Sequence, residues 1–195
     1  MIRIAALIAV AFALQDKSYE FDKGTVWTYD YATAFGNGKA QDTRIRTMTV
    51  SDVTGGKMTI DIEDRDPKTK KVTASSQQLL WQDDGYLLLA DVVKDKPTSG
   101  MRLLKIGAKK GESWGAWGDK DVLTMTHEGT KSLKVLGKDV NCLKIVRTDK
   151  TDTIVKSRDI FYVAPGYGLV QIDCEEAGVT SLLVTPLKLT AFKKP

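Results

Sequence analysis

One stretch of the sequence, residues 111–115, has the spacing of a serine nucleophile. It reads Gly-Glu-Ser-Trp-Gly and matches the Gly-x-Ser-x-Gly pattern, with Ser113 at the position of the nucleophile. An acid and a base follow in the order of an α/β-hydrolase triad, because Asp119 and Asp121 precede His127. Together these residues define a hydrolase hypothesis in which Ser113 attacks the substrate.

The elements expected around Ser113 argue against that chemistry. The pattern works at a sharp turn from a strand into a helix, which holds the serine exposed above an α/β sheet. Here the chain leads into another strand at 122–128, and no helical periodicity follows the motif. We therefore predict a glycine-rich turn with Trp114 and Trp117 packed inward, no catalytic residue and no enzymatic activity.

The other reactive side chains do not indicate a metal or cofactor site. His127 is the only histidine, and it shares strand parity with Leu123 and Met125, which predicts a core-facing position. Acidic residues at 61–66 are followed at once by lysines at 68–71, which is typical of a solvated charged hairpin and not of a calcium-binding loop. A lone histidine and two cysteines 32 residues apart predict no metal site. Because no phosphate-binding glycine loop precedes a helix, we also expect no nucleotide cofactor.

The two cysteines, Cys142 and Cys174, are expected to be free. They lie in strand-like runs on either side of a third run at 153–163. In a simple meander the intervening strand separates them by about 10 Å, which exceeds the Cα separation of a disulfide. Two small buried thiols follow from this geometry, and a disulfide formed in an oxidising compartment is the alternative.

The N-terminus has the three parts of a signal peptide in the usual order. Arg3 supplies a positive charge, residues 4–12 form an apolar run, and Ala-Phe-Ala at 11–13 fits a cleavage site. The run is shorter than the roughly 20 residues of a membrane-spanning helix. We predict a signal peptide at 1–13 and an exported domain at 14–195 without a transmembrane segment. It would be periplasmic or extracellular, and without a lipid anchor because no cysteine follows the run. A buried N-terminal strand or helix is the alternative.

Composition describes one globular domain. The chain has 195 residues, 42% of them hydrophobic and 28% charged, which is enough for a single buried core. Removal of residues 1–13 would leave 28 basic and 25 acidic residues, a net charge of +3 spread along the chain. Such a mild excess does not form the basic patch of a nucleic-acid-binding protein, so we expect no nucleic-acid partner.

Short strands separated by turns account for most of the chain. Residues 58–63 and 170–175 alternate apolar and polar side chains with a period of two. Turn signals such as Asn37-Gly38, Asp84-Gly85 and Pro165-Gly166 recur at short intervals. This pattern predicts an all-β protein, built as one strongly curved antiparallel sheet or a half-open barrel. A β-sandwich is the alternative.

Three local motifs recur in the same order, 81 to 87 residues apart. The pairs are Gly-x-x-Trp at 24–27 and 111–114, Gly-Lys at 56–57 and 137–138, and a Gly-Tyr turn at 84–87 and 165–169. A duplicated meander of about 80 residues would produce this recurrence. The frequent use of such motifs at the starts of strands explains it equally well.

Residues 161–170, Phe-Tyr-Val-Ala-Pro-Gly-Tyr-Gly-Leu-Val, resemble a family signature, Trp-Tyr-Ala-Pro-Gly-x-Gly-Leu-Val. It is found in an uncharacterised family of exported bacterial β-rich proteins and lipoproteins. In that family it follows a Gly-x-x-Trp element and a valine-led strand, which 111–114 and 135–142 match here. The sequence departs from the family by lacking a lipidation cysteine and by having Val163 where Tyr is usual. The resemblance, over roughly 20–192, implies export and a curved β-sheet and brings no known catalytic residue.

Aromatic residues remain as candidates for a binding site, since apolar clefts in β-barrels commonly hold ligands. The candidates are Trp27, Tyr29, Trp81, Trp114 and Trp117. Packing in the core is the competing interpretation for all of them. Three functions follow: a binding or carrier module for an apolar or lipid-like ligand, which we favour; an assembly accessory that pairs a strand edge with another envelope protein; and, least supported, a hydrolase using Ser113.

Overall fold

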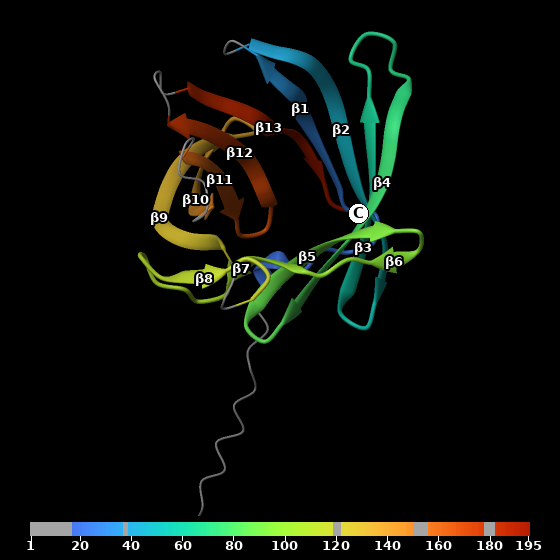
Figure 1. Ribbon diagram of the computed structural model, residues 1–195. Coiled ribbons are helices and arrows are strands. Elements are labelled where there is room, and N and C mark those ends of the chain that lie inside the picture. Colours follow the sequence, from blue (N-terminus) through green and yellow to red (C-terminus); the bar gives the residue numbers. More distant parts are fainter. Residues whose placement is uncertain (1–16, 37–38, 119–121, 150–155, 178–181) are drawn as a thin grey trace, which may run out of the picture.

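The structure is a computed structural model that describes residues 17–36, 39–118, 122–149, 156–177 and 182–195 (Figure 1). The predicted leader at 1–13 lies outside the described residues. The described chain forms one short 3-10 helix and thirteen strands. The helix is η1 (Lys17–Tyr19), and the strands are β1 (Val26–Gly36), β2 (Lys39–Thr54), β3 (Lys57–Arg65), β4 (Val72–Asp83), β5 (Tyr86–Val93), β6 (Lys96–Pro97), β7 (Met101–Lys105), β8 (Ser113–Gly115), β9 (Leu123–Val135), β10 (Lys138–Asp149), β11 (Lys156–Ala164), β12 (Gly168–Ala177) and β13 (Leu182–Lys193).

All the strands belong to one antiparallel sheet, in the order β6-β5-β4-β3-β2-β1-β13-β12-β11-β10-β9-β8, with β7 paired to β5. The sheet is strongly curved, as Figure 1 shows. Shifts of register occur in most of the ladders, for example between β1 and β2 and between β9 and β10, and such bulges bend strands and increase their twist. The predicted all-β, curved antiparallel sheet is confirmed, and the sandwich alternative is wrong because the strands form one sheet.

The two ends of the sheet meet at β7 and β8 without forming a full ladder. The backbone N–H of Arg102 in β7 donates to the carbonyl of Ala116, just after β8, at 2.7 Å. The indole Nε1 of Trp114 donates to the carbonyl of Arg102 at 2.9 Å. We call these contacts the seam. They bring the ends together, although the sheet is not closed by continuous strand pairing.

The chain repeats one plan of six strands. In the first repeat, β1, β2, β3, β4, β5 and β7 follow one another as neighbours, and in the second β8 to β13 do the same. The first strand of the first repeat pairs with the last strand of the second, since β1 lies beside β13. The other two ends meet at the seam. The three motif pairs of the sequence lie at equivalent places in this plan, before the first strand and at two turns.

Backbone geometry at the repeated Gly-x-x-Trp motifs is the same in both repeats. The N–H of Gly24 donates to the carbonyl of Val50 at 2.8 Å, and the N–H of Gly111 donates to that of His127 at 2.7 Å. The φ angles of the two glycines are +90° and +89°. His127 in the second repeat therefore occupies the position that Val50, a buried core residue, occupies in the first.

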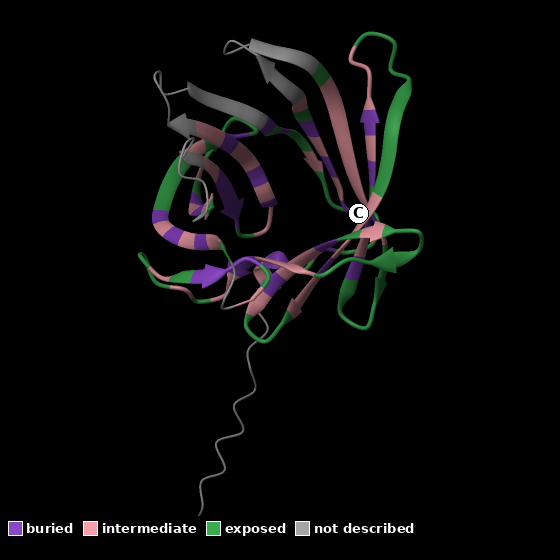
Figure 2. Cartoon of the chain, viewed as in Figure 1, coloured by how far each residue is buried: buried purple, intermediate pink, exposed green. Residues whose placement is uncertain are grey.

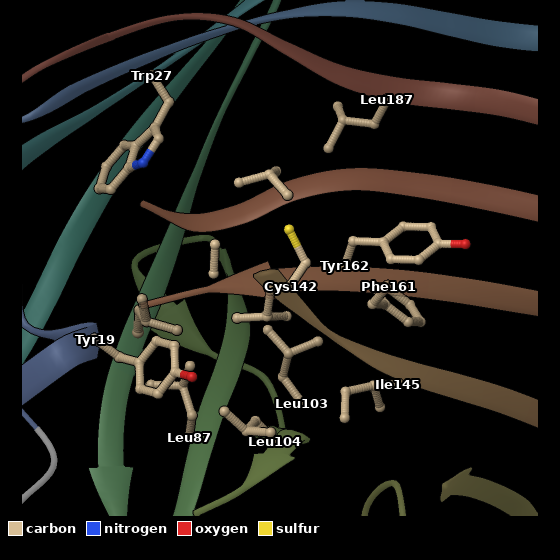
Figure 3. Packing of buried hydrophobic residues seen from close by; sticks show 14 of the residues in the cluster. Tyr19, Trp27, Leu87, Leu103, Leu104, Cys142, Ile145, Phe161, Tyr162 and Leu187 are labelled. Atoms are coloured by element: carbon tan, nitrogen blue, oxygen red, sulfur yellow. The ribbon is translucent and has the colours of Figure 1, made fainter. Parts of the chain in front are cut away.

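Buried apolar side chains from both repeats form one cluster (Figure 3). It includes Trp27 and Leu87 from the first repeat and Ile145 and Phe161 from the second. In β11 the five successive residues 160–164 are all buried, and because neighbouring side chains on a strand point to opposite faces, both faces of β11 are covered. Along the described ranges, no helix is both long and apolar enough to span a bilayer.

Candidate ligand cavity

An apolar cavity of about 60 Å³ lies between the first repeat and the β11–β12 turn. Its walls consist of aromatic, aliphatic and methionine side chains and one glycine, from Tyr19, Phe21, Trp27, Tyr29, Met48, Ile60, Leu80, Leu87, Leu89, Leu103, Val163, Gly168 and Leu169. Its volume corresponds to about two water-sized groups, and a space with such walls has few partners for water. Its chemistry suits a small apolar group.

Trp27 and Tyr29 of β1 point their rings into the walls and their polar atoms at backbone carbonyls. Trp27 Nε1 donates to the carbonyl of Tyr167 at 2.7 Å, and the Tyr29 hydroxyl donates to that of Leu169 at 2.8 Å. Burial raises the pKa of Tyr29 far above its usual value, an effect that the positive charge of Arg46 partly offsets. With these polar atoms satisfied, the two side chains offer mainly apolar surface to the cavity.

Gly168 forms a wall where a residue with a side chain would be strained. A Cβ atom there would lie 3.2 Å from Cζ of Phe21, and the φ angle of +75° disfavours residues with side chains. Phe21 in turn packs edge-on against Trp27, with ring centroids 4.8 Å apart. The glycine that the sequence places in the Pro-Gly-x-Gly turn thus sets how closely β12 approaches this aromatic pair.

A charged pair lies beside Tyr29 on the same sheet face. Arg46 is opposite Tyr29 in the β1–β2 ladder, and its guanidinium binds Asp64 with two hydrogen bonds of 2.7 and 2.8 Å. It also lies over the ring of Tyr31, 3.8 Å from the centroid. Burial opposes the charge of Arg46, but the bonds to Asp64 outweigh it and raise its pKa. This pair could not be predicted from sequence, because its members are 18 residues apart and meet only through strand register.

The three other tryptophans lie outside the cavity. Leu80 lines it, so the next residue, Trp81, points to the opposite face of the sheet. There the Trp81 ring packs over Gly100, where a Cβ atom would be only 2.6 Å from Cη2. Trp114 is buried, and it holds the seam through its bond to the Arg102 carbonyl.

Trp117 is 47% exposed, so the prediction that it packs inward is wrong. Strand β8 ends at Gly115, and the chain bends over 116–118, so the strand parity that places Trp114 inward does not extend to Trp117. The inward position belongs to Trp114, as predicted. Of the five aromatic candidates, the structure brings only Trp27 and Tyr29 to the cavity.

Ser113 is not placed to act with His127. Its Oγ lies 2.8 Å from the hydroxyl of Thr126, and it belongs to strand β8. The ring nitrogens of His127 face backbone carbonyls, with Nδ1 3.0 Å from the oxygen of Ala108 and Nε2 3.0 Å from that of Gly129. The predicted core-facing position of the histidine is confirmed. Asp119 and Asp121 lie outside the described residues.

The two cysteines are free, as predicted from strand order. Cys142 on β10 is buried, whereas Cys174 on β12 is only half-buried, and β11 lies between these strands. The Cys174 thiol donates to Oδ1 of Asp159 at 3.0 Å. Burial and this carboxylate raise its pKa to about 12, so the group is a protonated thiol at neutral pH.

The acidic residues at 61–66 make contacts with the neighbouring strand β2 and within the hairpin of β3 and β4. Asp64 binds Arg46, Glu63 binds Arg65, and Asp66 accepts backbone hydrogen bonds at the β3–β4 turn, which lower its pKa. In the part of the chain that the structure describes, no three His, Cys, Asp or Glu side chains gather closely enough to hold a metal ion.

Comparison with known proteins finds similarity at the level of structure. No protein-family model matches the sequence, and no curated protein is significantly similar to it. The crystal structure of a putative exported protein with a YmcC-like fold from Bacteroides fragilis superposes with a TM-score of 0.59, at 13% identity over 89% of this chain and 97% of that one. A putative lipoprotein from Parabacteroides distasonis gives a TM-score of 0.52, at 12% identity over 89% and 98%. This chain shares its fold with both.

Proposed function

We propose that the chain is an exported binding module that takes a small apolar group, such as the end of a lipid-like chain, into the cavity beside Trp27 and Tyr29. The observation that carries the proposal is the lining. The walls are mainly apolar, and the polar atoms of Trp27 and Tyr29 are bonded to backbone carbonyls. A space of about 60 Å³ admits the end of a chain, so the rest of the ligand lies outside.

Export is the second part of the proposal. It is supported by the order of charge, apolar run and Ala-Phe-Ala motif within residues 1–13. Both structural neighbours, a putative exported protein and a putative lipoprotein, agree with it. Mass spectrometry of the protein from its native host should give an N-terminus at Leu14. A protein recovered there with residues 1–13 intact would overturn this part.

Binding is tested with decanoate as a probe and with a variant that fills the cavity. Leu103→Phe adds a ring at the wall, so we expect it to weaken decanoate binding at least about tenfold while leaving the protein folded. Leu133→Phe is the matched control, because Leu133 packs against the core but does not line the cavity. Equal binding by both variants, or no binding by the wild type, contradicts the proposal.

The hydrolase hypothesis has its own test at Ser113. The Ser113 hydroxyl is exposed and lies within hydrogen-bond distance of Thr126. We therefore expect Ser113→Ala to leave any turnover of a p-nitrophenyl ester unchanged. Loss of such turnover in the variant would restore Ser113 as a nucleophile. Far-UV circular dichroism of the variant serves as the folding control.

A further inference from the structure

The first part of β4 has a free backbone edge. β4 pairs with β3 along its length, from Val72 opposite Arg65 onward, but pairing with β5 begins only at Gln77, opposite Val92. Residues 72–76 therefore have a strand neighbour on one side only, and all five are exposed. Figure 1 shows the hairpin of β3 and β4 projecting from the sheet, and Figure 2 shows the first part of β4 in the colour of exposed residues.

Most of this edge lacks the features that shield other edges of the sheet: a shift of register places a bulge at Thr73, but residues 74–76 keep a regular register with β3. Charged side chains, prolines and short strands prevent an edge from pairing with another chain. β6 is only Lys96–Pro97, and β8 is three residues long and held at the seam. β9 continues past the residues that pair with β8, and that part of β9 carries Lys131 and Lys134. Residues 72–76, in contrast, read Val-Thr-Ala-Ser-Ser, without a charge or a proline.

The two ends of the free edge carry opposite charge. Lysines at 68, 70 and 71 precede it, and all three are exposed. Where β5 turns away at its other end, a groove of about 460 Å³ opens. Carboxylates from Asp61, Glu63 and Asp95 line the groove together with one cation, Lys94. Glu63 also binds Arg65, and Asp61 accepts a hydrogen bond from Gln77 at 2.8 Å.

We propose that the free edges of two copies of this chain pair antiparallel across a twofold axis at Ala74. Such pairing places Val72 opposite Ser76 of the second copy and Thr73 opposite Ser75. It also brings the lysines at 70 and 71 of each copy to the acidic groove of the other. The positive end of each edge thus meets the negative end of its partner. A twofold axis makes each such contact twice, as a self-complementary interface requires.

The pairing is weak and independent of the ligand cavity, which lies elsewhere in the fold. Five residues of edge form only a small interface, so dimerisation should depend on protein concentration and weaken with added salt. Sedimentation equilibrium of the full mature chain over about a hundredfold range of concentration should show conversion from monomer to dimer. A strictly monomeric wild type across that range overturns the proposal.

Two charge variants locate the interface. Ala74→Lys places like charges directly opposite each other at the axis, and we expect it to weaken dimerisation at least about tenfold. Val53→Lys is the control, because Val53 is 44% exposed and belongs to the far end of β2, where it pairs with Met58. Equal dimerisation of the two variants overturns the assignment of this edge.

Cysteine variants test the register. In the proposed pairing Ala74 faces itself, at a Cα separation that a disulfide can bridge, so Ala74→Cys should give a covalent dimer on oxidation. Thr73→Cys should not, because each Thr73 faces Ser75 and the two copies of it lie diagonally apart. Equal crosslinking at both positions, or crosslinking of the wild type through Cys174, overturns the register.

Discussion

β4 and β11 hold the same place, the fourth strand, in the two repeats, yet their surroundings differ completely. β11 buries five successive residues, 160–164, whereas Leu80 is the only buried residue among the twelve of β4. β11 contains a run of four residues that favour β-structure, 160–163, whereas β4 has only Val72, Thr73 and Trp81 of this kind. Equivalent position in a repeated topology thus fixes the neighbours of a strand along the sheet, but not what covers its faces.

The cover on one face of β11 consists largely of long charged side chains. Glu128 of β9 binds Lys144 of β10 at 2.8 Å and also binds Arg158 of β11. Arg158 in turn binds Glu175 of β12 at 3.4 Å. The apolar stems of such side chains cover neighbouring apolar residues while their charges stay at the surface. Ile160, on the same strand face as Arg158, is only 1% exposed. Residues 72–76 of β4, all described by the structure, carry no charged side chain and so have no such network of ion pairs.

The largest expected effect is on the stability of β11. Phe161→Ala removes a buried ring and leaves a void, which should lower the free energy of unfolding by about 3–5 kcal/mol. Val72→Ala, at an exposed position of β4, should change it by less than about 0.5 kcal/mol. Urea unfolding followed by tryptophan fluorescence measures both. Similar values for the two variants would mean that the contrast between the strands does not hold in solution.

Alkaline pH should weaken β11 next. Burial and the negative charge of Asp173 raise the pKa of Tyr162 to about 12, an effect that Lys144 partly offsets. Because the folded protein holds this proton more tightly than the unfolded chain, the contribution is complete below pH 10 and is lost as pH rises from about 10 to 12. Across that pH range, the melting temperature should fall less steeply with pH for Tyr162→Phe than for the wild type. An unchanged slope would remove Tyr162 as the cause.

The ion-pair lattice should contribute least. The side chains of Glu128 and Lys144 are 33% and 26% exposed, and partly exposed pairs are worth roughly 1 kcal/mol or less. Glu128→Gln should lower stability by about that amount at low salt and by less at high salt. Glu63→Gln, which breaks a pair in the hairpin of β3 and β4, should have almost no effect. If Glu63→Gln costs as much as Glu128→Gln, the lattice has no special role in covering β11.

Local patterns in the sequence predicted the strands well. Alternation at 58–63 corresponds to the burial pattern of β3, in which Met58, Ile60 and Ile62 are buried. The parity of His127 with Met125 predicted its burial correctly. Parity alone did not show which of two neighbouring apolar residues faces inward, as at Leu80 and Trp81, because either choice leaves an apolar side chain in the core.

Contacts between distant strands could not be predicted in the same way. The bidentate pair of Arg46 and Asp64 depends on the register of β2 and β3, and register follows from bulges that leave no clear mark in one sequence. The seam between Arg102 and Ala116 depends on the curvature accumulated over the whole sheet. The cavity likewise exists only because η1, the first repeat and the β11–β12 turn converge there.

The pairing of β1 with β13 sets the order in which the molecule can be assembled. Val26 lies opposite Lys193, so the middle of the sheet joins the beginning of the described chain to its end. Contacts between residues so far apart in sequence form slowly, because a long loop must close before they are made. Each six-strand meander can form from local hairpins while synthesis continues, but β1 waits for its second neighbour until the last dozen residues have emerged.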